Sequence, residues 1–589
     1  MTAPRRWLGA VVFLGTLALA TSAWAQAIPS PAAPGRIERE LTPPPAPPPV
    51  SAPPPVPAAP AVPVPAPGAL TFVLKDVVVD GATVYTAQQL RQAYQGFLGK
   101  PVSVDALAQL EQAITTKYRR DGYILARALI PSGQAIDPAA GIVHVQVYEG
   151  YIDKVRLDPL DYEVGSRGKL IRAILDKIAG GCRSGDRPVD GKPCPLHRDT
   201  LERYLLLAND LPGVKASAII QPSPDVPGAA DLFVTITEKP YDVTAQVNNR
   251  GSPFTGPFLG ELSGSLNNLM DYYERTTVRG VVSLPFNELQ LGNATEEIPL
   301  GSEGLRMVLG GTDSRSRPGL ALRSQDVVTK SQSLSFALAY PLIRTRSENL
   351  LLRGEFNWRD DITDIGGGKL FDDHARILSA EASYDLADSW LGVNLIDVSI
   401  GQGLPILDAT PQNSPFASHS GADGVFTKFN AELSRLQQIM AEWNVLAAVS
   451  GQYSVHKLLV EEQFGYGGER FGRAYDPSEI LGDRGIAGKL ELQYTPAWGP
   501  GALGTGDVLK ALQFYSFYDI GRVWNPGVGE AVPSASAASA GAGVRYTVTD
   551  YVSGYLEVAK PLTRPVQSLV SQGESGKAPR IFFSVAGRF

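Results

Sequence analysis

The part of the chain after residue 240 alternates apolar and polar residues with the two-residue period of a β-strand. In the last nine residues, 581–589, the odd-numbered positions are apolar or glycine, whereas the even-numbered ones include Ser584 and Arg588. The segments 425–434 and 488–494 show the same split, with lysine and glutamate on one face only. A face with this many charged groups cannot be a dry core. The pattern therefore predicts strands with an apolar outer side and a wet inner side.

About sixteen such candidate strands follow residue 240, separated by turns and longer polar loops. Strands of roughly ten residues with alternating polarity and aromatic ends are typical of a transmembrane β-barrel, in which every backbone polar group is paired. We therefore expect 240–589 to form an all-β transmembrane barrel of about 16 antiparallel strands. A soluble β-sandwich or propeller is the alternative.

Between residues 70 and 240 the apolar spacing switches repeatedly between the strand period and the helix period. In chain order, a strand, two helices and two strands are expected at 72–79, 87–97, 104–120, 125–130 and 142–148. The same order returns at 152–157, 169–178, 200–209, 214–221 and 231–238. This internal repeat predicts two α+β modules of β-α-α-β-β order, 70–150 and 151–239. The strands at 125–130 and 214–221 are expected at the edges of their sheets.

The amino-terminal segment has the composition of an export signal. Arg5 and Arg6 precede an apolar run at 7–20, and small residues stand before Gln26. This order is typical of a secretory signal peptide, so we expect residues 1–25 to be removed after export. The stretch 26–69 is mainly Pro, Ala and Val, and it is expected to form an extended linker interrupted by one short helix.

Composition and charge narrow the function classes. The chain has 60 glycines, 22 tyrosines and only 4 methionines, which favours strands and turns, and its net charge of -7 gives no indication of nucleic-acid binding. The two cysteines, Cys182 and Cys194, are expected to form one disulfide in an exported protein. A zinc site that adds the nearby His197 lacks the usual paired ligand spacing.

The sequence contains no catalytic motif. A nucleophile elbow is missing, the glycines at 366–368 lack the spacing of a phosphate-binding loop, and the five histidines are scattered one by one. We therefore expect no enzymatic activity, no cofactor and no metal.

A charged, glycine-rich segment at about 467–485 interrupts the series of strands. It contains Arg473 and Tyr475, and a strand downstream contains Phe517, Asp519 and Gly521. A guanidinium group can hold a carboxylate through two parallel hydrogen bonds. We therefore expect an ion pair between Arg473 and Asp519 to hold this segment inside the barrel as a lid. A solvated surface loop is the alternative.

These features resemble those of the two-partner secretion (type Vb) outer-membrane transporters, the haemolysin-activator and filamentous-haemagglutinin-transporter type of the POTRA–barrel superfamily. The residues that match its two periplasmic POTRA modules are Gly122, Tyr123, Pro131, Glu149 and Gly150 in the first and Pro212 and Gly213 in the second. In the barrel, 248–252 resembles the first-strand motif and 517–521 matches Phe-x-Asp-x-Gly. The segment 472–475 stands where the family has Val-Arg-Gly-Tyr/Phe, with the first and third residues replaced.

The resemblance implies a function. It implies that the POTRA modules recognise an unfolded partner exoprotein, such as a large β-helical adhesin or haemolysin, and that the barrel passes it through the outer membrane to the cell surface. It also implies outer-membrane lipid as a partner, and recognition of Phe589 by the barrel-assembly machinery. A barrel-assembly factor of the same superfamily and a passive solute porin with periplasmic modules are the alternatives; two modules instead of five favour secretion.

Overall fold

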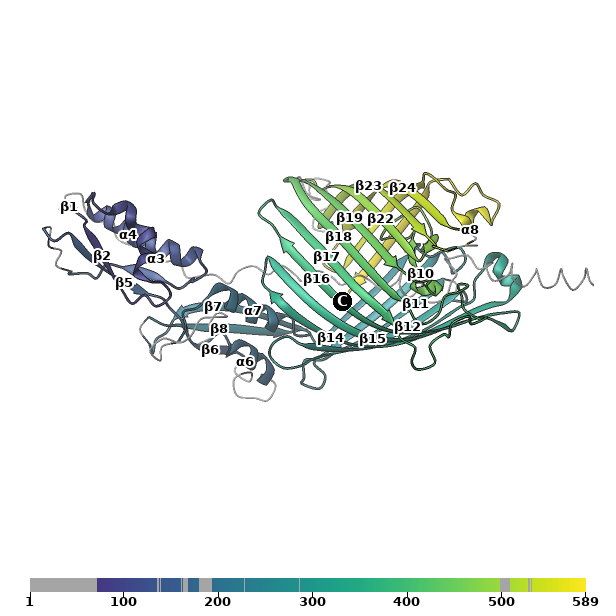
Figure 1. Ribbon diagram of the computed structural model, residues 1–589, viewed down its shortest axis with the longest axis horizontal. Helices are drawn as coiled ribbons and strands as arrows, with labels where there is room; N and C mark the ends of the chain where they lie inside the picture. The colour runs from purple at the N-terminus through teal and green to yellow at the C-terminus, as the bar shows by residue number, and fades with distance from the viewer. Residues whose placement is uncertain are drawn as a thin grey trace, which may run out of the picture.

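The computed structural model describes Arg36 and residues 71–589, except for 135–136, 138, 160–161, 163–167, 180–192, 227, 285, 498–508, 528–529 and 531. The expected signal peptide and most of the expected linker lie outside these residues, and so does Cys182. Two small α+β modules lie at one end of a large barrel (Figure 1). We call the opposite end, where the long loops lie, the distal end.

The first module is a three-stranded sheet, a two-stranded sheet and two helices. The strand expected at 72–79 is divided into β1 (Phe72–Val73) and β2 (Asp76–Asp80). The two parts belong to different sheets, because β1 pairs with β3 (Pro101–Val102). Helices α3 (Ala87–Tyr94) and α4 (Val104–Arg120) begin at the N-caps Thr86 and Ser103, whose hydroxyls accept backbone hydrogen bonds. The larger sheet has the order β2, β5 (Ile142–Tyr148), β4 (Arg127–Leu129), so β4 is an edge strand.

The second module repeats this plan. Its sheet has the order β6 (Ile152–Asp158), β8 (Ala230–Glu238), β7 (Val214–Pro222), and β7 is an edge strand as expected. Helix α6 (Lys169–Leu175) is shorter than expected, whereas α7 (Arg198–Asn209) begins two residues early because the ring of His197 accepts a hydrogen bond from Asp199 N at its first turn. Helices and sheet enclose an apolar core that includes Ile171, Ile174, Leu201, Leu232 and Val234.

The barrel of about sixteen strands that the sequence predicts is confirmed. In the described part of the chain, sixteen antiparallel strands close on themselves, with β9 paired to β26. The strands are β9 (Tyr241–Asn248), β10 (Phe258–Asn267), β11 (Arg275–Leu284), β12 (Leu289–Pro299), β13 (Arg306–Ser316), β14 (Val327–Arg344), β15 (Glu348–Ile365), β16 (Gly368–Ala387), β17 (Gly392–Gly403), β18 (Thr427–Met440), β19 (Trp443–Ser454), β22 (Arg484–Tyr494), β23 (Ala511–Trp524), β24 (Ser534–Thr547), β25 (Val552–Pro561) and β26 (Arg580–Arg588).

The two faces of the barrel wall differ in polarity. Large apolar side chains on the outer face remain exposed, among them Leu262, Leu334, Leu490 and Ile581. The inner face carries charged pairs such as Arg279 with Glu261, whose atoms approach to 2.7 Å. An exposed apolar belt around a closed, internally paired sheet is the arrangement of a membrane-spanning barrel. Among the described helices, none is long and apolar enough to cross a membrane.

The second module is attached to the adjacent turns of the barrel by polar and apolar contacts. Arg344 at the end of β14 holds the carboxylate of Asp210 with two hydrogen bonds of 2.6 and 2.8 Å. Tyr273, in the turn between β10 and β11, is buried in the core of the second module. Arg203 of α7 donates a hydrogen bond to the carbonyl of Pro341. The module is therefore positioned by the turn between β10 and β11 and by the end of β14, at the same end of the barrel.

Candidate functional site

The segment between β19 and β22 folds back into the barrel. It contains the short helix η4 (Val460–Glu462) and a two-stranded sheet of β20 (Phe464–Tyr466) and β21 (Ile480–Gly482). The segment that folds inward therefore begins earlier than residue 467, the start that the sequence predicts. We call this segment, residues 455–483, the lid. Its apolar residues pack on the inner wall of the barrel; this small core includes Tyr466, Phe471, Tyr475 and Ile480 of the lid and Ala448, Ala487, Val523 and Ala537 of the wall.

Arg473 lies at the tip of the lid and faces Asp519 on β23. Its Nη2 and Nε donate hydrogen bonds of 2.9 and 3.0 Å to the two carboxylate oxygens of Asp519, and its Nη1 donates one of 2.5 Å to Glu491 on β22. The guanidinium plane also covers the ring of Phe517, 3.5 Å from its centroid. Arg473 is 4% exposed and Asp519 is fully buried, so the ion pair is shielded from solvent.

The main chain of the lid tip contributes to the same contact. The N–H groups of Gly472 and Arg473 donate to Asp519 Oδ2 at 3.2 and 3.0 Å. Gly472 has φ +87, a conformation that disfavours β-branched residues. Glycine in place of the family's valine therefore suits the backbone that this lid adopts.

Tyr475 and Gly521 fasten the lid on the other side of its tip. The hydroxyl of Tyr475 donates to the carbonyl of Ala538 at 3.0 Å, and the Tyr475 ring is buried. Gly521 lies against the ring of Tyr466, where a Cβ atom would come within 2.2 Å of Tyr466 Cδ2. The absence of a side chain at position 521 lets the lid sheet rest on β23. The structure thus brings together the five residues that the sequence singles out for holding the lid, and we call them the lock: Arg473, Tyr475, Phe517, Asp519 and Gly521.

Sequence reasoning missed several partners of this contact. Glu491, Glu557 and Arg545 complete the charged cluster, with Arg545 Nη1 donating to Glu491 at 2.7 Å. The alternation in 488–494 already placed Glu491 on the inner face, so a signal was present. Arg36, the only one of the first 70 residues that the structure describes, is also buried against the lid, donating to the carbonyl of Gln463 at 2.6 Å and to Ser478 at 2.8 Å.

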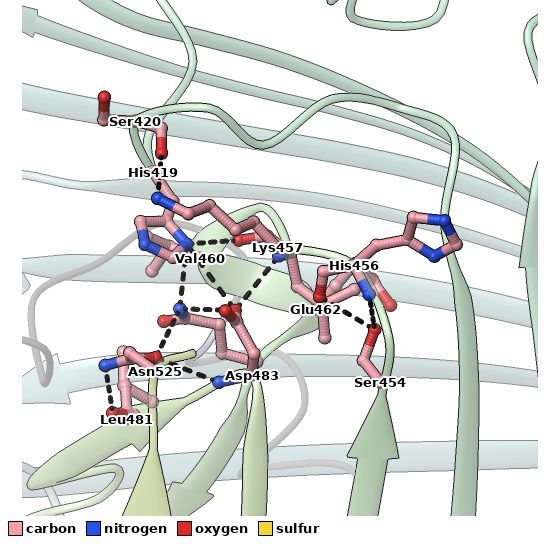
Figure 2. A network of polar contacts seen from close by, with 12 residues as sticks. His419, Ser420, Ser454, His456, Lys457, Val460, Glu462, Leu481, Asp483 and Asn525 are labelled. Carbon is pink, nitrogen blue, oxygen red and sulfur yellow. Dashed lines mark hydrogen bonds and ion pairs between the residues drawn. The ribbon is translucent and has the colours of Figure 1, made fainter. Parts of the chain in front are cut away.

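The lid is also fixed where it rejoins the wall, around Asp483 (Figure 2). The carboxylate of Asp483 accepts hydrogen bonds of 3.0 Å from Leu458 N and from Gln463 Nε2. Its backbone N–H donates to Asn525 in the loop after β23, also at 3.0 Å. We call this network the lid root, because it ties both ends of the lid to a neighbouring distal loop.

His419 joins a further distal loop to the lid root. Its ring nitrogens lie 3.5 Å from Asp483 Oδ1 and 3.3 Å from Glu530 Oε2. Burial favours the neutral imidazole, but the two carboxylates outweigh burial and raise the pKa of His419 to about 9. His419 is therefore a cation at neutral pH that bridges two acidic groups.

The motif residues of the first module serve its fold and its contact with the second module. The carboxylate of Glu149 accepts hydrogen bonds from the main chain at Thr83 and from Tyr118, at 2.8 and 2.9 Å. Gly122 and Tyr123 contact His197 of the second module, and the rings of Tyr123 and His197 meet edge to face at 5.1 Å. The carbonyl of Gly150 accepts from Leu196 N at 2.9 Å, whereas the Pro131 side chain is exposed in a turn.

The motif residues of the second module lie at its junction with the barrel. Pro212 lines a narrow crevice together with Pro299 and Pro341 of the barrel. The carbonyl of Gly213 accepts a hydrogen bond of 2.7 Å from Lys239 N, just before β9 begins. This position suits a role in orienting the module on the barrel.

The remaining two assignments concern the cysteines and the carboxyl terminus. Cys194 is buried and disulfide-bonded, while its expected partner lies outside the described residues, so that pairing stays a prediction. The side chain of Phe589 is 60% exposed on the outer face. Its backbone exchanges two hydrogen bonds with Val243, at 2.8 and 3.1 Å, and so continues the contact between the first and last strands.

Comparison with known proteins agrees with this geometry. Residues 232–546 match the family described as haemolysin secretion/activation protein ShlB/FhaC/HecB, and residues 72–150 match the ShlB-type POTRA domain. The heme/hemopexin transporter protein HuxB of Haemophilus influenzae (strain 86-028NP) is 24% identical over 82% of this chain and 81% of its own. The outer membrane transporter CdiB-2 of Burkholderia pseudomallei (strain 1026b) is 26% identical over 77% and 74%.

A solved structure has the same fold. CdiB from Escherichia coli superimposes with a TM-score of 0.68 at 19% identity, over 91% of this chain and 93% of that one.

Proposed function

The chain belongs to the haemolysin secretion/activation family ShlB/FhaC/HecB, and we propose that it exports one large partner exoprotein through a barrel whose lid is held shut by Arg473 and Asp519. It is an outer-membrane transporter, with its POTRA modules in the periplasm and its distal loops at the cell surface. The observation that carries the proposal is the buried ion pair between the lid tip and the inner wall.

The periplasmic modules offer open sheet edges to an unfolded client. An extended segment can add to β4 or β7 through main-chain hydrogen bonds, which give affinity with little dependence on sequence. Ile219 on β7 and its neighbour Phe233 on β8 are half and about one third exposed. They supply an apolar surface beside the β7 edge, and this surface supports client selection by the second module.

The lumen suits passage of an unfolded chain once the lid has moved. Its wall carries charged pairs and serine, asparagine and threonine side chains, such as those that line the cavity at Asn293, Thr312, Ser333 and Asn357. A polar wall can hydrogen-bond a passing backbone at many equivalent positions, so it holds no single segment tightly. The lid then controls whether the passage is open.

The client is a protein of the two-partner secretion type, such as a β-helical adhesin or haemolysin. Lipid of the outer membrane contacts the apolar outer face, and the barrel-assembly machinery recognises the exposed Phe589 during biogenesis. Neither step requires a cofactor or catalysis by this chain.

The test is to delete the gene and compare all surface and secreted proteins with those of the parent strain. Loss of one large exoprotein, restored by the wild-type chain but not by Asp519→Ala at equal barrel level, is the expected result. Loss of many outer-membrane barrels would instead indicate an assembly factor. An unchanged protein profile with altered solute uptake would indicate a porin.

A further inference from the structure

We infer that Arg250 is a second restraint on the lid, acting on the main chain of the lid tip from the seam where the barrel closes. The inference rests on the proposed function of the lid and adds a positioning residue to it. Arg250 follows β9 at the distal end, and its side chain contacts β25, β26 and the lid tip.

All three guanidinium nitrogens of Arg250 donate hydrogen bonds. Nη1 donates to the backbone carbonyl of Arg473 at 3.0 Å, Nη2 to Glu557 at 2.7 Å and Nε to the hydroxyl of Tyr555 at 2.8 Å. The group also stacks over the ring of Phe582 with 4.1 Å to the centroid, and Arg250 is only 9% exposed. One guanidinium nitrogen thus donates to the lid, while the other two donate to side chains of β25.

This contact does not depend on the side chain at position 473. The acceptor on the lid is a carbonyl group, which every residue has. The acceptor on the wall, Glu557, lies 3.9 Å from Arg473 Nη1, whereas Arg473 is held by Asp519 and Glu491 at 2.9 and 2.5 Å. The lid tip is therefore held from two sides, through its side chain by β22 and β23 and through its main chain by Arg250.

Arg250 is anchored at the contact between the first and last strands. Its N–H donates to Asn248 Oδ1 at 3.0 Å. Next to it, the Asn249 side chain donates to the carbonyl of Ile581 at 2.8 Å and accepts from Phe583 N at 2.7 Å. Among the described residues, β9 and β26 pair only over 244–248 and 584–588. The hydrogen bonds of Asn249 extend this short contact between the two strands. Movement of the lid tip is therefore coupled to this corner of the wall.

The experiment measures lid opening without any client. The full-length wild type, Arg250→Gln, Arg473→Ala and the double variant are reconstituted in planar bilayers, and the fraction of time spent in the high-conductance state is recorded. Arg279→Gln, which removes a partly buried lumenal arginine paired with Glu261, is the control. Heat-dependent mobility on a gel verifies that each barrel is folded.

We expect Arg250→Gln to raise the open fraction on the order of tenfold, the scale of one lost charge-assisted hydrogen bond. In the double variant the open fraction should exceed that of Arg473→Ala, because Arg250 holds the main chain of the lid tip whereas Arg473 holds the tip through its side chain. The inference would be overturned if Arg250→Gln had the same open fraction as the wild type, or if the double variant had no larger an open fraction than Arg473→Ala.

Two further results separate this inference from the proposed function. If Arg250→Gln fails to insert, Arg250→Lys replaces it. A lysine can keep the ion pair with Glu557, but its single nitrogen cannot also reach both Tyr555 and the lid carbonyl. An open fraction equal to that of the wild type in Arg250→Lys overturns the inference. If opening increases while export of the exoprotein is unaffected, the restraint by Arg250 is supported, and it is the control of export by the lid that fails.

Discussion

Asp519 holds Arg473 by its main chain as well as by its side chain. Asp519 Oδ2 accepts from both the backbone N–H and the Nε of Arg473, each at 3.0 Å, while Oδ1 accepts from Nη2 at 2.9 Å. The two partners are therefore not equivalent. Removing the Arg473 side chain leaves Asp519 with main-chain donors, whereas removing Asp519 leaves Nε and Nη2 of a buried guanidinium and two main-chain N–H groups without their acceptor.

The first expectation is that Asp519→Ala and Arg473→Ala both reduce export of the partner exoprotein, and that Asp519→Ala reduces it more. Breaking a buried pair costs about 3–5 kcal/mol when the remaining charge has no partner, and here Glu491 partly retains Arg473. The double variant should be little worse than Asp519→Ala, because contacting residues are not additive. Export is measured at matched barrel levels.

Arg470→Ala is the comparison for this series. Arg470 lies on the same lid and pairs with Glu432 at 2.7 Å, but its side chain is 48% exposed. An exposed pair contributes about 0–1 kcal/mol, so its loss should have a much smaller effect. Normal export by Arg473→Ala, or strictly additive losses, would contradict the lock.

The second expectation concerns the barrel itself. Sixteen strands that close on themselves in the described chain should resist unfolding by dodecyl sulfate at room temperature, because no strand edge is open to the detergent. The unheated protein should therefore migrate faster on a gel than the boiled protein. Equal mobility of the two samples would count against a closed barrel.

The third expectation is that deletion of residues 70–150 abolishes export without preventing membrane insertion. The first module has its own core and contributes an open sheet edge at β4. Export is compared with the amount of heat-modifiable barrel in the same membranes. Normal export by the truncated protein would place client recognition in the second module or in the lumen.

The fourth expectation is that Asp210→Asn loosens the second module on the barrel. The change weakens a paired contact to Arg344, which is only 6% exposed, and hydrogen bonds to charged groups contribute about 1.5–3 kcal/mol. The module should become more sensitive to protease, and export should fall while the barrel stays inserted. Asp225→Asn, which changes an exposed pair with Lys154 in the same module, is the control; equal protease sensitivity in both would argue against this contact.

The fifth expectation is that the lid root weakens at high pH. The pKa of His419 is raised to about 9, above the value near 6.5 of a free imidazole. The stabilisation of the lid root by charged His419 is therefore complete below about pH 6.5 and is lost as the pH rises through 9. The acidic groups that face the His419 ring are Asp483 and Glu530, and Lys457 pairs with Glu530.

Protease cleavage of the distal loops, measured from pH 7 to pH 10, checks this expectation. Cleavage of the wild type should increase across that interval, and the increase should be absent in His419→Gln, which can hydrogen-bond but carries no charge. A wild-type profile that is flat, or one that His419→Gln reproduces, would refute a role for the charge.

The sequence by itself determined which residues of the wall face inward and which face lipid. A strand has a period of two residues, so one correctly placed residue assigns the rest of its strand; Glu491 and Leu490 show this on β22. The internal repeat and the paired motifs around Arg473 and Asp519 likewise identified the two modules and the two ends of the lock. These are properties of local spacing, and local spacing is present in the linear chain.

Only the tertiary structure decided which other groups meet at the lid. Arg250 reaches the carbonyl of Arg473 across more than 200 positions of sequence, and His419 meets Asp483 through loops whose paths no periodicity sets. Closing the sheet brings the first strand beside the last, and the lid packs on the inner wall of the closed barrel. Contacts of this kind depend on the shape of the whole barrel, because neither partner carries a local signal for the other.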